Sequence, residues 1–175
     1  MAHTCEPLEC RSEIMKKDDE QNIHFDFLGN CPEFIDDIAR HWQAEWSSDK
    51  ETSGFNKQKT GLLKKLNTDR PPFVIVAFSG KKLIGTASLF EQDLDSRPDL
   101  TPWLAGVFVL PEYRGRGVAS RLIQKVLDEA KNIGFKIVYL HTETTAGLYE
   151  KLGWKKVADC YNDQNLRSTI YNIKT

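Results

Sequence analysis

The chain has 175 residues, of which 40% are hydrophobic and 28% are charged, a balance typical of a globular protein with a sizeable core. Its formal net charge is −1, so composition gives no electrostatic case for nucleic acid or an anionic membrane as the main partner. No apolar stretch approaches the roughly 20 residues of a spanning helix, and the N-terminus lacks the apolar segment that a signal peptide needs.

The first part of the chain predicts an arm, a strand and two helices. Residues 1–20 are polar, charged and without a hydrophobic period, so we expect a mobile N-terminal arm ahead of a single domain over 21–175. Apolar and polar residues alternate over 22–28, which predicts a strand with one buried face. Apolar residues at helical spacing predict helices over 32–46 and 56–66.

The rest of the chain predicts strands alternating with helices. Three β-rich runs come first, and the turn residues Ser79, Gly80 and Lys81 join the first two as a hairpin. An amphipathic helix follows the third run and ends at Gly134, which suits the left-handed position after a helix. We expect strands over 73–78, 82–90, 103–110, 136–140, 154–161 and 168–173, and helices over 117–133 and 144–152.

The most informative segment is Val107–Leu122, with the sequence VFVLPEYRGRGVASRL. Gly115 and Gly117 lack a Cβ, so the backbone there bends tightly and approaches a ligand closely. The helix that begins near Gly117 leaves its first N–H groups without intrahelical partners, and its dipole is positive at that end. Arg114 and Arg116 add two cations. Together these features predict a binding site for phosphate or pyrophosphate.

The spacing of this segment excludes two common phosphate loops. No Lys-Ser/Thr pair follows the glycines, as a Walker loop requires, and the third glycine of a dinucleotide fingerprint is missing. What remains, Arg-x-x-Gly-x-Ala over Arg114–Ala119, resembles the coenzyme A pyrophosphate loop of the GNAT-type N-acetyltransferase superfamily. Two other interpretations stay open for this segment alone, a surface turn and an RNA-binding basic tract.

A second segment resembles the same superfamily independently. Residues 146–154, AGLYEKLGW, are similar to its C-terminal signature, in which a short helix carries a Tyr that faces the coenzyme sulfur. Gly153 fits the left-handed position that ends such a helix. The other interpretation of Tyr149 is an aromatic residue that packs the helix on a sheet. The resemblance covers residues 73–173 well and the preceding part of the chain loosely.

The resemblance implies a fold and a set of coenzyme contacts. The fold is a mixed α/β single domain, whose central mixed sheet of about six or seven strands is flanked by helices and has a bulged strand and a V-shaped opening at the coenzyme site. Acetyl-CoA would be the cosubstrate, and no metal is expected. The residues that would contact the coenzyme are Val107, Phe108, Val109, Arg114, Gly115, Arg116, Gly117, Val118, Ala119, Ser120, Thr142 and Tyr149.

The resemblance also implies direct attack, in which an amine held in line attacks the acetyl thioester within a ternary complex. The backbone N–H of Val109 would stabilise the developing oxyanion, and the phenol of Tyr149 would protonate the leaving thiolate. Many members carry an Asn seven residues before this Tyr. The chain has Thr142 there, whose shorter side chain still donates or accepts a hydrogen bond.

The general base follows less directly from the residues. In some relatives a carboxylate twelve positions before the Tyr serves, but here that position is Ile137. We predict Glu91, at the end of its strand, as the base. Glu143, His141, His41 and ordered water stay open as alternatives.

The acceptor is expected to be a primary amine. In the loop over 91–101, carboxylates outnumber the one arginine, which suits a cationic amine, although solvated charge is the ordinary role of such loops. A peptide N-terminus, a lysine side chain, a polyamine, an aminoglycoside and a small amino acid all stay open. We predict an acetyl-CoA-dependent N-acetyltransferase, monomeric or homodimeric. A non-catalytic acyl-CoA-binding module is the first alternative, and a nucleotide- or RNA-binding protein is the second.

The four cysteines indicate a reducing compartment. Cys5 and Cys10 lack the C-x-x-C spacing, no His cluster accompanies them, and Cys31 and Cys160 lie far along the chain. We interpret all four as free thiols of a cytoplasmic protein. A disulfide between Cys5 and Cys10 stays an open alternative.

Overall fold

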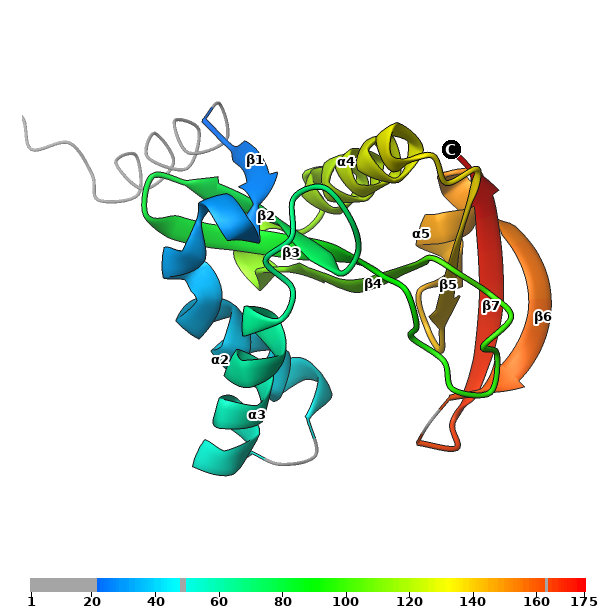
Figure 1. Cartoon of the computed structure of the whole chain (residues 1–175), viewed down its shortest axis with the longest axis horizontal. Coiled ribbons are helices and arrows are strands. Elements are labelled where there is room, and N and C mark those ends of the chain that lie inside the picture. The colour runs from blue at the N-terminus through cyan, green and yellow to red at the C-terminus, as the bar shows by residue number, and fades with distance from the viewer. Residues whose placement is uncertain (1–21, 48–49, 163) are drawn as a thin grey trace, which may run out of the picture.

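The computed structural model describes residues 22–47, 50–162 and 164–175 of the chain (Figure 1). The arm predicted over 1–20, with Cys5 and Cys10, lies outside the described residues. Cys31 and Cys160 are free thiols, as predicted. Among the described residues, no helix combines the length and the apolar character needed to cross a membrane.

Seven strands form one sheet in the order β1-β2-β3-β4-β5-β7-β6. All neighbouring strands are antiparallel except β4 and β5, which are parallel. The strands are β1 (His24–Phe27), β2 (Phe73–Ser79), β3 (Lys82–Phe90), β4 (Trp103–Val109), β5 (Ile137–Thr142), β6 (Lys155–Tyr161) and β7 (Arg167–Lys174). The prediction of a mixed sheet in a single α/β domain is confirmed.

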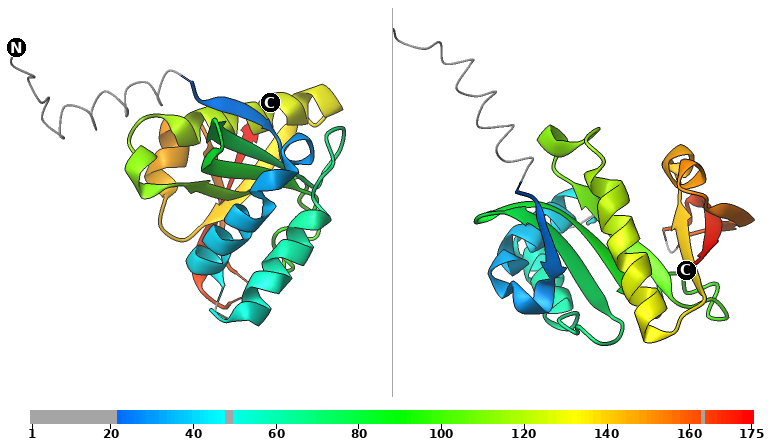
Figure 2. Two further views of the ribbon diagram at one scale, coloured as in Figure 1. Left: turned by 90° about the vertical axis from the view of Figure 1, so that its left-hand side faces the viewer. Right: turned by 90° about the horizontal axis from the view of Figure 1, so that it is seen from above.

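Helices cover both faces of this sheet (Figures 1 and 2). The helices α4 and α5 pack on one face, where their apolar residues share a core with β2, β3, β4 and β5. The helices α2 and α3 pack on the other face, against the alternate side chains of β2. The helical elements are η1 (Leu28–Asn30), η2 (Pro32–Phe34), α2 (Ile35–Trp46), α3 (Thr52–Leu63), η3 (Pro111–Tyr113), α4 (Val118–Ile133) and α5 (Ala146–Lys151).

The sheet opens between its two parallel strands. β4 and β5 pair only at Trp103 and Tyr139, near the start of β4. Beyond that point the strands diverge, and the view from above shows the two halves of the sheet on either side of α4 (Figure 2). The V-shaped opening predicted from the family resemblance is therefore present. It leaves one edge of the C-terminal half of β4 without a neighbouring strand.

The first two helices differ from the sequence prediction in their boundaries. The first helix begins with a 3-10 turn at Pro32, and its α-helical part starts at Ile35. The helix predicted over 56–66 spans Thr52–Leu63 instead. Leu66, the last residue of the predicted helix, forms an isolated β-bridge with Phe73, so the backbone is already extended there.

Candidate active site

A cavity of about 500 Å³ lies beside β4 and brings the two sequence motifs together. Its walls come from β4, the glycine loop, the first turn of α4 and the helix α5, and α2 contributes one residue. Ten of the twelve predicted coenzyme contacts line it, and Arg116 and Thr142 do not. The lining residues are Glu45, Val107, Phe108, Val109, Tyr113, Arg114, Gly115, Gly117, Val118, Ala119, Ser120, Thr145, Leu148 and Tyr149.

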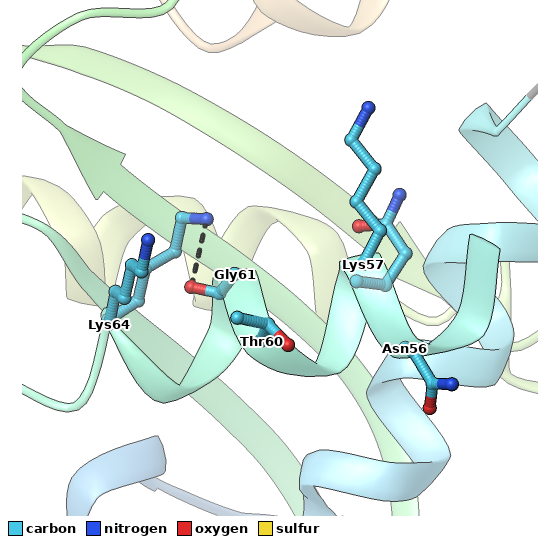
Figure 3. Close-up of a pocket in the computed structure, with 7 residues that line it drawn as sticks. Asn56, Lys57, Thr60, Gly61 and Lys64 are labelled. Carbon is cyan, nitrogen blue, oxygen red and sulfur yellow. Dashed lines mark hydrogen bonds between the residues drawn. The ribbon is translucent and has the colours of Figure 1, made fainter. Parts of the chain in front are cut away.

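A hollow of similar size, about 560 Å³, lies along α3 (Figure 3). Its lining residues all come from this helix and the turn after it, and Figure 3 shows them spread along one helix with a single hydrogen bond, from Lys65 Nζ to the carbonyl of Gly61. None of the predicted site residues lies there. The hollow on α3 is therefore not the candidate site.

A β-bulge shapes the strand at the cavity. Thr86 of β3 faces Phe108, but Ser88 faces Ala105, so β4 has one more residue than β3 between these pairs. The extra residue is accommodated at Gly106, whose φ of +59° lies in the left-handed region. The bulged strand predicted from the resemblance is confirmed.

Beyond the bulge, the backbone of Val109 faces the opening. The carbonyl of Val109 accepts a hydrogen bond from Nε of Arg114 at 2.9 Å, whereas the N–H of Leu110 donates to Ile84 of β3. The N–H and C=O of one strand residue point to the same edge, and successive residues alternate. The N–H of Val109 therefore points away from β3, toward the edge of β4 that the opening leaves unpaired.

The glycine loop and α4 form an anion-binding end of the cavity. Gly115 and Gly117 both have φ of +75°, a conformation that favours glycine. Gly117 is the N-cap of α4, no side chain caps this helix end, and its first turn has no acidic residue. The first N–H groups of a 16-residue helix thus remain for a ligand, at the positive end of the helix dipole.

The two loop arginines have different surroundings. Arg114 lines the cavity and is held against β4 through its bond to Val109. The guanidinium of Arg116 lies over the Tyr113 ring, 5.6 Å from the centroid, and outside the cavity lining. Arg114 is consequently the cation nearest to the candidate phosphate position within the cavity wall.

Tyr149 is buried in the cavity wall, with 8% of its surface exposed. Its ring packs edge-on against Trp154 at a centroid distance of 5.9 Å. Burial raises the pKa of the Tyr149 phenol above its ordinary value, and the Thr145 hydroxyl, hydrogen-bonded to the phenol, opposes that rise. The phenol is therefore protonated at neutral pH and available as a proton donor.

Thr142 lies next to the site rather than in its lining. Its Oγ1 is 2.8 Å from Oγ1 of Thr145 and accepts a hydrogen bond from the Thr145 backbone N–H. This contact organises the turn that leads into α5. The predicted coenzyme contact of Thr142 stays a prediction.

Glu91 lies on a different cavity. That cavity, of about 460 Å³, is lined by Glu91, Asp93 and Asp95 together with Lys65, Pro72, Phe90 and Gln92. Other charges of the predicted acceptor loop are paired: Arg97 makes a two-bond contact with Asp99 at 2.8 Å, and Asp93 lies 3.4 Å from His141. Glu91 and Tyr149 therefore belong to separate cavities.

The carboxylate that does line the Tyr149 cavity is Glu45, near the end of α2. One turn earlier, His41 stacks on the ring of Phe108 at 5.0 Å, and Trp46 meets that ring edge-on at 6.5 Å. Sequence reasoning placed His41 among the open alternatives but missed Glu45. The helical spacing of His41 and Glu45 could have flagged them as one face, but no local motif connects α2 to the glycine loop.

Comparison with known proteins agrees with this geometry. The model of the acetyltransferase (GNAT) family matches residues 33–154. A curated relative, N-alpha-acetyltransferase 30 of Schizosaccharomyces pombe, is 34% identical over 95 residues, which cover 52% of this chain. The match spans 63% of that relative's own length.

Solved structures share the fold at lower sequence identity. The yncA protein of Salmonella typhimurium, solved with its cofactor acetyl-CoA, has a TM-score of 0.60 at 18% identity, covering 87% of this chain and 93% of that one. An aminoglycoside 6'-N-acetyltransferase complexed with coenzyme A has a TM-score of 0.69 at 16% identity, covering 86% of this chain and 96% of that one.

Proposed function

The chain belongs to the acetyltransferase (GNAT) family, and from this premise we propose that it transfers the acetyl group of acetyl-CoA to a primary amine within a ternary complex. The observation that carries the proposal is the single cavity that joins the N-terminus of α4, the outward-facing backbone of β4 and the phenol of Tyr149. A binding module would need the first two of these features but not the phenol.

The residues of the cavity suit coenzyme A. A Cβ added at Gly115 or Gly117 would meet no protein atom within 4 Å, so the space above this loop is open to a pyrophosphate. Arg114 supplies a cation there, and Val107, Phe108 and Leu148 line an apolar stretch that suits the pantetheine arm. The backbone groups of β4 at the unpaired edge would hydrogen-bond its amides, as a neighbouring strand would.

The chemistry needs three groups from the protein. Acetyl-CoA supplies an activated thioester, which a neutral amine attacks without a covalent enzyme intermediate. The N–H of Val109 would donate to the oxyanion that develops on the acetyl oxygen. As the carbon–sulfur bond breaks, Tyr149 would transfer its proton to the thiolate, since a phenol and an alkyl thiol have comparable pKa values.

The third group is a base that takes the proton of the incoming ammonium. We favour Glu45, because it is the carboxylate in the lining of the Tyr149 cavity and lies on the α2 face that contacts Phe108. Glu91 stays the competing candidate from the sequence. A carboxylate beside the acetyl position would also attract an acceptor that arrives as a cation.

A thiol-release assay with acetyl-CoA over a panel of amines tests the proposed function. The panel includes an α-amine and an aminoglycoside, after the names of two relatives, as well as a lysine side chain and a polyamine. Turnover of one class supports the proposal. Calorimetric binding of acetyl-CoA without turnover of any amine would favour the binding module, and binding of ATP without coenzyme A would favour a nucleotide-binding protein.

A further inference from the structure

A buried chain of hydrogen bonds connects α2 to the bulge in β4. The indole Nε1–H of Trp42 donates to Oγ1 of Thr86 at 3.2 Å, and that hydroxyl donates to the carbonyl of Gly106 at 2.9 Å. Trp42 is 5% exposed and Thr86 is fully buried. A bulge interrupts the regular ladder, and here the Thr86 side chain supplies a donor for the Gly106 carbonyl.

The Trp42 ring also packs directly on the bulge. A Cβ at position 106 would lie 2.9 Å from a ring carbon of Trp42 and 3.1 Å from Oγ of Ser88, so only a glycine fits under the ring. This contact joins α2 directly to the bulge in β4. Through that docking, Glu45 reaches the cavity from the same helix, three residues beyond Trp42.

We infer that Thr86 and Trp42 are positioning residues, which hold the bulge so that the backbone of β4 beyond it and Glu45 are both aligned on the acetyl group. The inference rests on the proposed function, because it names what aligns the donor and the base of that reaction. Neither residue lines the cavity, so they act through Gly106 and not on the substrates.

Three variants of β3 separate positioning from mere packing. Thr86→Val keeps the shape of the side chain but leaves the Gly106 carbonyl and the Trp42 indole without their shared partner. Thr86→Ser retains the hydroxyl. Ser88→Ala is the matched control, because Ser88 is equally buried and lies two residues along β3, but its hydroxyl has no hydrogen-bond partner among the described residues.

We expect Thr86→Val to lower kcat about 10–100-fold at saturating acetyl-CoA, the size of a small misalignment of reacting groups. The coenzyme Kd from calorimetry should change less than kcat, because the glycine loop and α4, which hold the pyrophosphate, are untouched. Thr86→Ser and Ser88→Ala should stay within about twofold of the wild type in kcat. The inference is overturned if Thr86→Val matches Ser88→Ala in kcat, or if Thr86→Ser fails to restore it.

A second readout does not depend on acetyl transfer. The indole N–H signal of Trp42 is one of four in the chain and is assignable by mutation in a ¹H–¹⁵N spectrum. Thr86→Val should shift it, speed its exchange with solvent and move the amide signals of Val107 and Val109, whereas Ser88→Ala should leave them in place. If those amide signals do not move in Thr86→Val, the hydrogen bonds of Trp42 and Thr86 do not position β4. This result holds even if no acceptor amine has been found.

Discussion

At the scale of single residues, Tyr149 has the most specific of the proposed chemical roles. Its phenol lies in the cavity wall, and its ring is held by Trp154. The sequence identified it through the motif around it, and the structure adds its burial, which raises the pKa of the phenol. Burial alone does not distinguish a proton donor from a packed aromatic ring, so the phenolic oxygen needs a direct test.

Replacing Tyr149 by Phe removes one oxygen and keeps the ring. We expect kcat to fall roughly 10²–10⁴-fold, the range for loss of a general acid, while the acetyl-CoA Kd and the melting temperature stay nearly unchanged. Steady-state kinetics at saturating acetyl-CoA measures kcat, and calorimetry measures the acetyl-CoA Kd and the melting temperature. A loss in kcat below about fivefold would remove Tyr149 from the catalytic residues.

The pH dependence of kcat tests the same residue. The acid must be protonated to act, and burial raises the pKa of its phenol, so deprotonation should not reduce kcat until above about pH 10. A pH profile of wild type and Tyr149→Phe measures this. An alkaline fall that occurs below about pH 9 in the wild type and is missing in the variant would contradict it.

Glu45 and Glu91 compete for the role of the base. We expect Glu45→Gln to lower kcat/KM for the amine about 10²-fold near pH 7, where most of the amine is an ammonium. The deficit should shrink as pH rises toward 10, because more amine then arrives already neutral. Measuring kcat/KM of Glu45→Gln and Glu91→Gln between pH 7 and about 10 decides between the two carboxylates. A large, pH-dependent loss in Glu91→Gln alone would restore Glu91.

At the scale of elements, the N-terminus of α4 is the proposed phosphate site. Gly117 and Gly134 are the two ends of this helix, both in the left-handed region, and a Cβ added at either position would meet no protein atom within 4 Å. They differ in surroundings, because Gly117 lines the cavity and Gly134 does not. The helix therefore contains its own control.

Gly117→Val should raise the KM and Kd for acetyl-CoA about 10–100-fold, because a side chain there blocks the pyrophosphate from backbone donors worth about 1.5–3 kcal/mol each. Gly134→Val introduces comparable backbone strain and should lower the melting temperature without changing the coenzyme Kd. Calorimetry on both variants measures this, and equal coenzyme affinities in the two would show that the loop is not the phosphate site.

Helix and strand positions could be predicted from the sequence wherever the hydrophobic pattern had one clear period. The apolar stripe of α4 and the terminating Gly134 lie where the sequence predicts them, whereas the strand predicted over 22–28 is shorter, since β1 spans His24–Phe27 and Leu28 begins a 3-10 turn. The end of α3 also differs, because Leu66 satisfies a helical stripe and a β-bridge equally well in sequence. The family resemblance predicted a bulged strand but not its position, and the structure places the bulge at Gly106; a glycine within a strand has several local explanations.

At the scale of the whole molecule, the site depends on the gap between β4 and β5. The sequence predicted the glycine loop and the Tyr149 helix separately, and the opening of the sheet brings them to one cavity. Glu45 could not be found this way, because α2 is brought to the cavity by tertiary packing on the sheet, including that of Trp42 on the bulge. Contacts of that kind depend on tertiary docking and leave no periodic signal in the chain.

Direct transfer is the central claim of the proposed function: the amine attacks the acetyl thioester within a ternary complex, without a covalent enzyme intermediate. The most direct test is an initial-rate study in which acetyl-CoA and an active amine are both varied. Direct attack in a ternary complex predicts double-reciprocal lines that intersect. Parallel lines, with an acetylated enzyme detected by mass spectrometry in the absence of amine, would contradict it.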